Sequence, residues 1–193
     1  MIKISIISVT FGILIVVFGN HHLNRLYTEA LNDISSGDYT DAIDKLEWIS
    51  QFKSNSLLER HLEQAIYEEK TIPVVKEFFN TLEDVYPKIK TASSVKEVII
   101  LCQSLKDAFR EFESLDVREG SEISDFILKI KNNEMYELLK EDYVFGNELN
   151  SIVNTFGLSS LVAEMAVYTA TEIPSRCIES LLEYEMPQQL LKD

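Results

Sequence analysis

Cys177 has the sequence surroundings that come closest to those of a reactive nucleophile. It follows Arg176 and falls in the first turn of a helix that Pro174 is predicted to open. A neighbouring positive charge and a helix N-terminus both lower the pKa of a thiol and so favour the thiolate. A catalytic cysteine also needs a base, and no histidine of the sequence is tied to this one. We therefore expect Cys177 to be a structural residue.

The histidines do not form a recognisable metal site. The chain has 3 of them, His21, His22 and His61. Adjacent residues of a helix point about 100° apart, so His21 and His22 are poorly placed to hold one ion together. The sequence contains no H-E-x-x-H motif and no cluster of cysteine and histidine. We predict no metal ligands.

Carboxylates are abundant around Gly120. The nearby acidic residues are Glu111, Glu113, Asp116, Glu119, Glu122 and Asp125. An EF-hand calcium loop needs an oxygen ligand at its third position and glycine at its sixth, but counting from Asp116 gives Arg118 and Ser121. Glycosidases use paired carboxylates, yet nothing in this sequence selects a pair. A solvated acidic surface is the interpretation that we favour.

Motifs for activated serines and bound cofactors do not occur in the sequence. We find no G-x-S-x-G, no glycine-rich phosphate loop and no deaminase zinc signature. We therefore predict no catalytic residue, no cofactor and no enzymatic activity. An all-α enzyme whose site is not recognised is an alternative.

The N-terminal residues carry the strongest pattern of the chain. Residues 4–18 read ISIISVTFGILIVVF and contain no charge. As a helix they would span roughly 25 Å, slightly less than a ~30 Å hydrocarbon core. The residues expected to insert into a bilayer are Ile4, Ile6, Ile7, Val9, Phe11, Ile13, Leu14, Ile15, Val16, Val17 and Phe18. We predict that residues 1–19 direct the protein to a membrane.

This segment has three possible roles. An uncleaved anchor would end at Gly19-Asn20, with His21, His22 and Arg25 at the level of the lipid headgroups. A cleaved signal peptide needs small residues at its exit, and the end of this segment matches that pattern poorly. A buried helix of a soluble protein is the third role. We favour a single-pass anchor with the following domain outside the cytoplasm, because a short N-terminal tail before an apolar segment is typical of signal anchors.

The rest of the chain is strongly acidic. Lys3 is the only charged side chain of the first 19 residues, so 17 Lys and Arg and 32 Asp and Glu follow it, a balance of −15. This charge repels nucleic acids and anionic lipid headgroups. It would suit a basic protein partner, although solubility alone is the simpler explanation.

Cys102 and Cys177 leave the redox compartment open. An oxidising compartment could join them in a disulfide. Cys102 falls on an apolar helix face, where a reduced cysteine behaves as a small hydrophobic residue. We favour two reduced cysteines.

Residues 23–49 predict a helical hairpin. Apolar residues recur at helical spacing before and after Ser35-Ser36-Gly37-Asp38. The run Gly37-Asp38-Tyr39-x-x-Ala42-Ile43-x-x-Leu46, with Ala30 before it, resembles the turn and second helix of a tetratricopeptide repeat. The resemblance covers residues 23–52, about one repeat, and implies a surface that binds a protein partner. One repeat length further on the pattern does not recur, so we predict one such hairpin within another helical fold.

The sequence after the hairpin predicts more helices. The clearest one follows a capping box over 94–97 and carries an apolar seam up to Phe112. Others are predicted to begin near Ser54, at Thr71-Ile72-Pro73 and at Pro174, or to cover 123–130, 135–139, 149–156 and 161–170. The predicted fold class is all-α, an N-terminal transmembrane or signal helix followed by a multi-helix bundle or short solenoid-like array.

The predicted domain organisation has three parts. Residues 1–19 are the membrane anchor or signal segment, 20–186 an acidic all-α domain, and 187–193 a loose tail. The stretch 116–122 is the only candidate seam within the domain.

Three aromatic residues of the hairpin are candidates for binding a partner: Tyr27, Tyr39 and Trp48. Tyr39 and Trp48 are nine positions apart, about 180° around a helix, so they cannot share a face. We expect one of them to pack in the core and the other to be more exposed, where it could anchor a partner. Packing of all three within the hairpin is the simpler alternative.

These features favour a membrane-anchored, non-enzymatic protein-interaction domain, such as an adaptor or assembly factor of the cell envelope. We expect it to contact protein partners and, through its N-terminal segment, the lipid bilayer, but not nucleic acid. The main alternative is a small acidic inhibitor or immunity-type protein that neutralises a basic partner.

Overall fold

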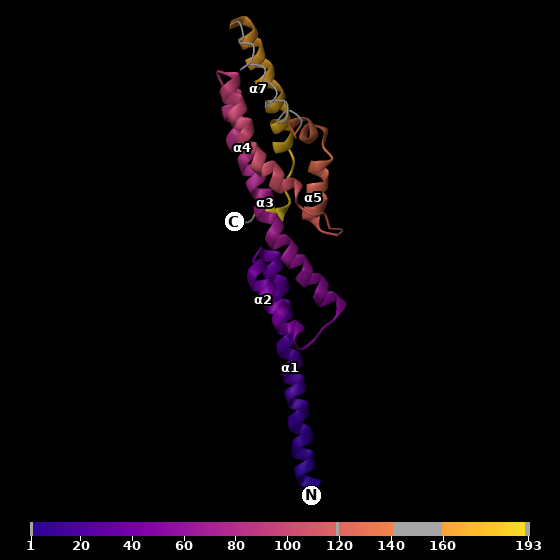
Figure 1. Ribbon diagram of the computed structural model, residues 1–193. Helices are drawn as coiled ribbons and strands as arrows, with labels where there is room; N and C mark the ends of the chain where they lie inside the picture. Colours follow the sequence, from indigo (N-terminus) through magenta and orange to yellow (C-terminus); the bar gives the residue numbers. More distant parts are fainter. Residues whose placement is uncertain (1, 119, 141–159, 192–193) are drawn as a thin grey trace. The chain divides into compact units, whose positions relative to one another are not determined.

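The chain divides into two compact groups of helices. A computed structural model describes residues 2–118, 120–140 and 160–191, and gives only the backbone of residues 2–18, 95, 99, 102 and 160–170. Every regular element among these residues is a helix, which confirms the predicted all-α class. The two groups are Met1–Lys70 and Thr71–Leu191, here called unit 1 and unit 2 (Figure 1). The sequence had predicted one domain over 20–186.

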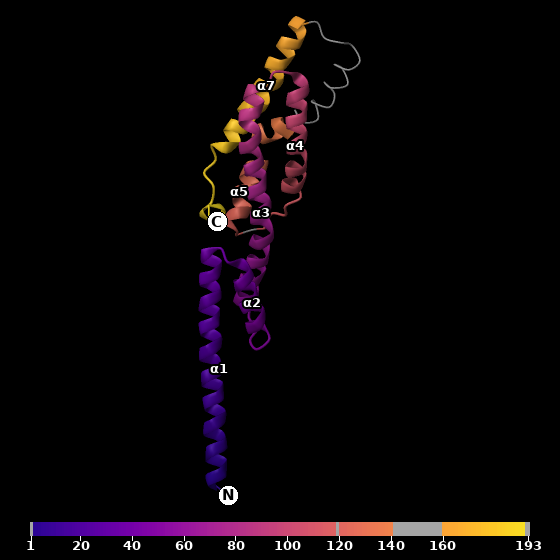
Figure 2. The same cartoon turned by 90° about the vertical axis from the view of Figure 1, so that its left-hand side faces the viewer.

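Unit 1 is built on a pair of antiparallel helices. α1 (Ile2–Ser36) packs through its C-terminal part against α2 (Tyr39–Ser50), and the two lie side by side in Figures 1 and 2. Ala30 and Ala42 are completely buried, and their small side chains let the two backbones approach closely. Leu46 and Ile49 bury the next turns of α2. The predicted hairpin is confirmed.

The turn of this hairpin depends on Gly37. Its φ of 89° lies in the left-handed region that glycine adopts without strain. The amide of Gly37 donates to the carbonyl of Ile34 at 3.1 Å, and that of Asp38 to the carbonyl of Asp33 at 2.8 Å. Asp38 then caps α2, because its carboxylate accepts from the amide of Asp41. The chain thus reverses within two residues.

α1 does not end at Gly19-Asn20, where the sequence analysis placed a boundary. It continues without a break to Ser36. One glycine inside a helix costs only about 1 kcal/mol relative to alanine, which is too little to end a helix whose next turns pack against α2. The apolar segment and the first helix of the hairpin are therefore one continuous helix.

No helix whose side chains the structure describes is long and apolar enough to cross a membrane. The side chains of the residues predicted to insert into a bilayer, between Ile4 and Phe18, are not among those that the structure describes. Their insertion stays a prediction.

α3 (Ser56–Thr91) is one helix where the sequence predicted two. Asn55 starts it, since its side-chain oxygen accepts from the amides of Leu57 at 3.1 Å and Leu58 at 2.8 Å. Pro73 and Pro87 both lie inside it. An interior proline removes a hydrogen bond and costs about 3 kcal/mol or more, but packing on both sides can offset that cost. Buried residues keep one helical phase across Pro73, namely Ala65, Ile72, Val75, Phe79 and Leu82.

Pro174 repeats this outcome in unit 2. The helix predicted to open there is instead the last part of α7 (Ser160–Leu182), which contains the proline. Cys177, Ile178 and Leu181 are buried immediately after it, so tertiary packing again holds the helix together. The helix predicted over 149–156 lies outside the described residues.

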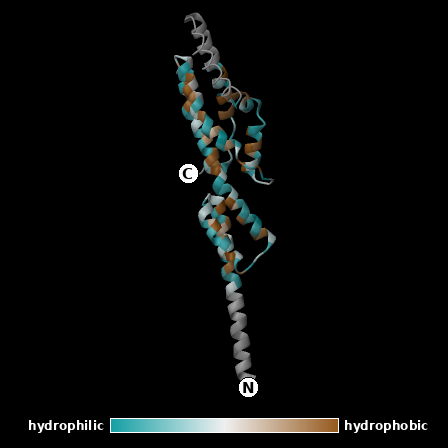
Figure 3. Cartoon of the chain, viewed as in Figure 1, coloured by the Kyte–Doolittle hydropathy of each residue, from teal (hydrophilic) through white to brown (hydrophobic). Residues whose placement is uncertain are grey.

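Aromatic rings form the core of unit 2. Phe78 of α3 stacks on Phe112 of α4 (Val95–Glu113) with ring centroids 4.3 Å apart, and meets Phe109 edge-on at 5.2 Å. Tyr136, in the helical stretch 134–140, completes the cluster at 5.2 Å from Phe109. The seam of α4 is therefore an intramolecular core, and Figure 3 shows apolar and polar residues alternating along these helices.

The predicted capping box of α4 is present with one change of partner. The Ser94 hydroxyl accepts from the amide of Glu97 at 3.2 Å. The Glu97 carboxylate accepts from the amide of Ser93 at 2.9 Å, whereas a regular capping box would use the amide of Ser94.

The connection after α4 belongs to unit 2 and is not the predicted seam. Lys131, at the end of α5 (Glu122–Lys131), donates to the carbonyls of Glu113 at 2.8 Å and Leu115 at 3.1 Å. The amide of Arg118 donates to the Ser124 hydroxyl at 2.5 Å. Burial lowers the pKa of Lys131 and outweighs the opposite effect of Glu113. These bonds join the two helices across the stretch 116–122.

The C-terminal residues are also packed, although the sequence predicted a loose tail from Pro187. A short 3₁₀ turn, η1 (Gln188–Leu190), places Leu190 in the core with 4% of its surface exposed. Gln189 donates to the Glu122 carboxylate at 2.9 Å. Burial of Leu190 and the bond from Gln189 dock this segment, while Leu191 stays exposed.

We predict that Gly37→Ala destabilises unit 1 by about 1–2 kcal/mol, because an L-residue is strained at positive φ. Trp48, the one tryptophan of the chain, lies in unit 1 and reports its unfolding by denaturant in detergent solution. Gly19→Ala is the control: it lies within α1 with nothing within 4 Å of the added methyl group. Equal effects of the two substitutions would contradict the assigned turn.

Tyr136→Phe should loosen unit 2. The buried hydroxyl donates to the Glu113 carboxylate at 2.6 Å, and a hydrogen bond to a charged group contributes about 1.5–3 kcal/mol. We expect amide exchange in α4 to become roughly tenfold faster by mass spectrometry. Tyr86→Phe is the control, because that hydroxyl bonds the exposed side chains of Lys90 and Glu179 at the surface and not in the core. Unchanged exchange in Tyr136→Phe would show that the bond contributes nothing.

Candidate functional site at the turn between α2 and α3

The end of unit 1 at which α2 passes into α3 exposes a group of large apolar side chains. Trp48 is 40% exposed, Phe52 63% and Leu57 52%. Among the described residues of unit 1 these are the exposed large hydrophobic ones. We call Trp48, Phe52 and Leu57 the apolar tip.

Ring contacts tie the apolar tip to α1. The rings of Trp48 and Phe52 have centroids 4.8 Å apart, and the Trp48 ring meets His22 of α1 edge-on at 5.8 Å. Such aromatic pairs contribute about 0.5–1.5 kcal/mol beyond the burial of their area. Trp48 is thus held in place although much of its surface is open to solvent.

Backbone hydrogen bonds fix the turn that carries Phe52. The amides of Phe52 and Lys53 both donate to the carbonyl of Ile49, each at 3.0 Å. The Ser54 hydroxyl donates to the Glu59 carboxylate at 2.5 Å, just before Asn55 caps α3. The exposed side chains therefore stand on a defined backbone.

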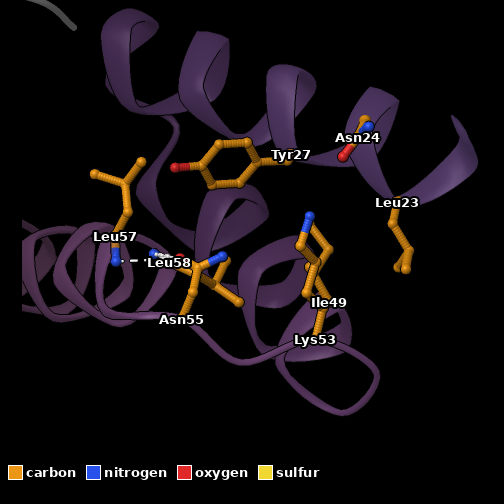
Figure 4. Close-up of a pocket in the computed structure, with 8 residues that line it drawn as sticks. All are labelled: Leu23, Asn24, Tyr27, Ile49, Lys53, Asn55, Leu57 and Leu58. Atoms are coloured by element: carbon orange, nitrogen blue, oxygen red, sulfur yellow. Dashed lines mark hydrogen bonds between the residues drawn. The ribbon is translucent and has the colours of Figure 1, made fainter. Parts of the chain in front are cut away.

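A hollow of about 220 Å³ lies beside the apolar tip. α1, α2, the turn and α3 all contribute to its wall (Figure 4). The lining residues are Leu23, Asn24, Tyr27, Ile49, Lys53, Asn55, Leu57 and Leu58. The wall contains neither carboxylate nor imidazole, and most of its surface is apolar, so it suits an apolar group.

Tyr27, which lines the hollow, connects α1 to α3 through His61. The Tyr27 hydroxyl and Nδ1 of His61 are 2.7 Å apart, and their rings are 5.8 Å apart. Burial raises the pKa of Tyr27. Burial, and then the positive charge of Arg60, lowers the pKa of His61. A neutral imidazole is therefore the form that this packing favours.

The three predicted partner-binding residues do not share a surface. Trp48 belongs to the apolar tip, Tyr27 is half-buried, and Tyr39 is 7% exposed in the core of the hairpin. The Tyr39 hydroxyl is buried near Glu68, and burial followed by the charge of the Glu68 carboxylate raises its pKa. The expectation that either Tyr39 or Trp48 packs in the core while the other is exposed is confirmed.

Phe52 and Leu57 were missed by the sequence analysis. Their signal was available, because adjacent Leu57 and Leu58 cannot both face the core of an amphipathic helix. The structure buries Leu58 and exposes Leu57. Phe52 stands four residues after Trp48, a spacing that brings two side chains together on one helical face.

The candidates for chemistry are dispersed. Cys177 is buried, and the Cys102 side chain lies outside the described residues, so their pairing stays open. No three His, Cys, Asp or Glu side chains in the described part of the chain are grouped to hold a metal. In the acidic group around Gly120, Glu113 is bound by Tyr136 at 2.6 Å and by Lys140 at 3.4 Å.

Comparisons with models of known protein families, with curated proteins and with solved structures gave no match. The resemblance of residues 23–52 to a tetratricopeptide repeat stays a prediction.

The burial of His61, together with the charge of Arg60, predicts that unit 1 loses stability in mild acid. Because the folded-state pKa of His61 is lowered, the unfolded chain binds the proton first. The contribution of neutral His61 to the unfolding free energy is complete above its unfolded-state pKa of about 6.5. It is lost as the pH falls through the lower folded-state pKa. We expect a falling unfolding free energy between about pH 7.5 and 5.5 by Trp48 fluorescence.

His61→Asn should flatten this pH dependence, whereas His21→Asn, which removes an exposed histidine, should keep it. An unchanged slope in His61→Asn would assign the pH dependence to other groups.

Proposed function

We propose that this chain is a membrane-anchored protein-interaction domain without catalytic activity, of the kind that serves as an adaptor or assembly factor in the cell envelope. One observation carries the proposal: α1 joins the uncharged residues 4–18 to the hairpin without a break. A helix inserted through those residues would hold unit 1 directly at the membrane surface, with no linker between them.

The composition of the segment supports its insertion. Residues 4–18 contain no charge and are followed by His21, His22 and Arg25, which suit the headgroup layer. We propose a single pass that leaves the helical units outside the cytoplasm.

The exposed face of α2 supports the interaction role. Asp41, Asp44 and Glu47 follow one another at three-residue spacing and are all exposed. They form an acidic ridge that would complement a basic protein. Complementary charge speeds association and selects partners more than it adds affinity, as expected for an adaptor.

An acidic inhibitor is the second candidate, favoured by the −15 balance beyond residue 19. An inhibitor and an adaptor differ in how binding affects the activity of the basic partner. An inhibitor abolishes the activity of its basic partner, whereas an adaptor leaves that activity intact and brings the partner to the membrane.

The tagged full-length chain should sediment with membranes, resist alkaline carbonate and enter detergent extracts. Capture from those extracts should recover a discrete basic protein. We expect Asp44→Lys/Glu47→Lys to reduce its recovery at least about tenfold, a loss of about 1.4 kcal/mol. Glu77→Lys/Glu83→Lys makes the same change of charge at exposed sites on α3 and should bind as the wild type does.

Two results would each defeat part of this proposal. A full-length chain that stays in the supernatant after high-speed centrifugation would contradict the anchor. Equal recovery with both double variants, or no protein above background, would contradict the acidic ridge as a binding surface.

A further inference from the structure

We propose that the apolar tip is a second membrane contact, which lies in the lipid headgroup layer beside the point where α1 leaves the bilayer. This inference rests on the proposed anchoring of residues 4–18. It assigns a lipid surface to Trp48, Phe52 and Leu57, in place of a protein partner.

Distance along α1 places the tip at that level. His22, which contacts the Trp48 ring at 5.8 Å, follows Phe18 by four residues, or about 6 Å of helix. The headgroup region adds about 5–8 Å on each side of the hydrocarbon core. If the core ends near Phe18, then His22 and the ring against it lie within the headgroup layer.

The course of the chain agrees with this placement. α2 runs antiparallel to α1, so its last residues and the following turn lie toward the N-terminal part of α1. Figures 1 and 2 both show α1 continuing past that turn. An inserted α1 would bring the turn, and not the Gly37 end of the hairpin, to the bilayer.

The side chains at the tip have the chemistry of an interfacial contact. Tryptophan is enriched at membrane interfaces because its ring is apolar and its indole N–H is polar. Phe52 and Leu57 are more than half exposed, and Leu57 is also part of the wall of the hollow. Lys53 stands between them and can extend its ammonium group toward lipid phosphates.

The distribution of charge along unit 1 also favours the tip as the end that meets lipid phosphates. Residues 20–28 and 46–62, which surround the tip, contain Arg25, Lys53 and Arg60 against Glu47 and Glu59, and hold all 3 histidines of the chain. Residues 29–45 and 63–70 contain eight carboxylates and two lysines. Within residues 20–70 of unit 1, the end that would meet phosphates is thus the part that is not acidic.

The intrinsic fluorescence of Trp48 tests this placement directly, because the chain has 1 tryptophan. We would reconstitute the full-length chain in phosphatidylcholine vesicles that contain some phosphatidylglycerol. Lipids brominated close to the headgroup should reduce the Trp48 emission by about half, and lipids brominated at the chain ends should reduce it less. Aqueous iodide should quench Trp48 more weakly in vesicles than in detergent-free denaturant.

The matched control moves the fluorophore to the other end of α2. Trp48→Phe/Thr40→Trp carries one tryptophan at an exposed position eight residues earlier, about 12 Å further along the helix. The emission of this variant should be insensitive to brominated lipid and should be quenched by aqueous iodide.

Flotation of the same vesicles separates the two proposals. A chain that floats while its Trp48 responds to iodide but not to brominated lipid would overturn the membrane role of the tip and leave the anchor intact. A chain that does not float would overturn both. Protection of Trp48 from lipid and iodide alike would mean that protein, such as a second copy, covers the tip, and would also overturn the lipid assignment.

Discussion

The packing of α1 against α2, in a hairpin where Ala30 and Ala42 are completely buried, is the contact on which the rest of unit 1 depends. In this hairpin the Trp48 ring reaches His22, and Leu23 and Ile49 line one hollow. A larger residue at either alanine would push the helices apart and cost about 1–3 kcal/mol through overpacking.

Unit 2 is stabilised by a different kind of interaction, a polar contact placed against an aromatic core. Tyr136 packs on Phe109 and Phe112 and directs its hydroxyl to Glu113. Burial alone would raise the pKa of Glu113, but the Tyr136 hydrogen bond and Lys140 lower it overall. Burial and the same carboxylate raise the pKa of Tyr136. The pair thus keeps a buried phenol neutral and a carboxylate charged at neutral pH.

Local patterns predicted much of this fold, and the failures share a physical cause. The turn at Gly37 and the cap at Ser94 depend on neighbours in sequence, and both were found. The sequence predicted a helix start at Pro73 because proline is a local signal. The structure instead continues α3 through Pro73, and the regular spacing of buried residues on both sides of it depends on packing. Whether Tyr39 or Trp48 is buried depends on where α3 lies. The spacing of residues within α2 cannot predict the position of another helix. The division at Lys70 falls inside a helix, where no turn residue marks it.

The unbroken course of α1 makes the number of residues between the apolar segment and the hairpin matter more than their identity. Adding or deleting one residue between Phe18 and Leu23 would rotate the hairpin by about 100° about the axis of α1. The face that carries Trp48 would then turn away from its present direction, however well the hairpin itself folded. A change of seven residues, close to two full turns, would restore the rotation but shift the hairpin by about 10 Å. Changes of length between Phe18 and Leu23 therefore set both the distance of the hairpin from the apolar segment and its orientation about the axis of α1.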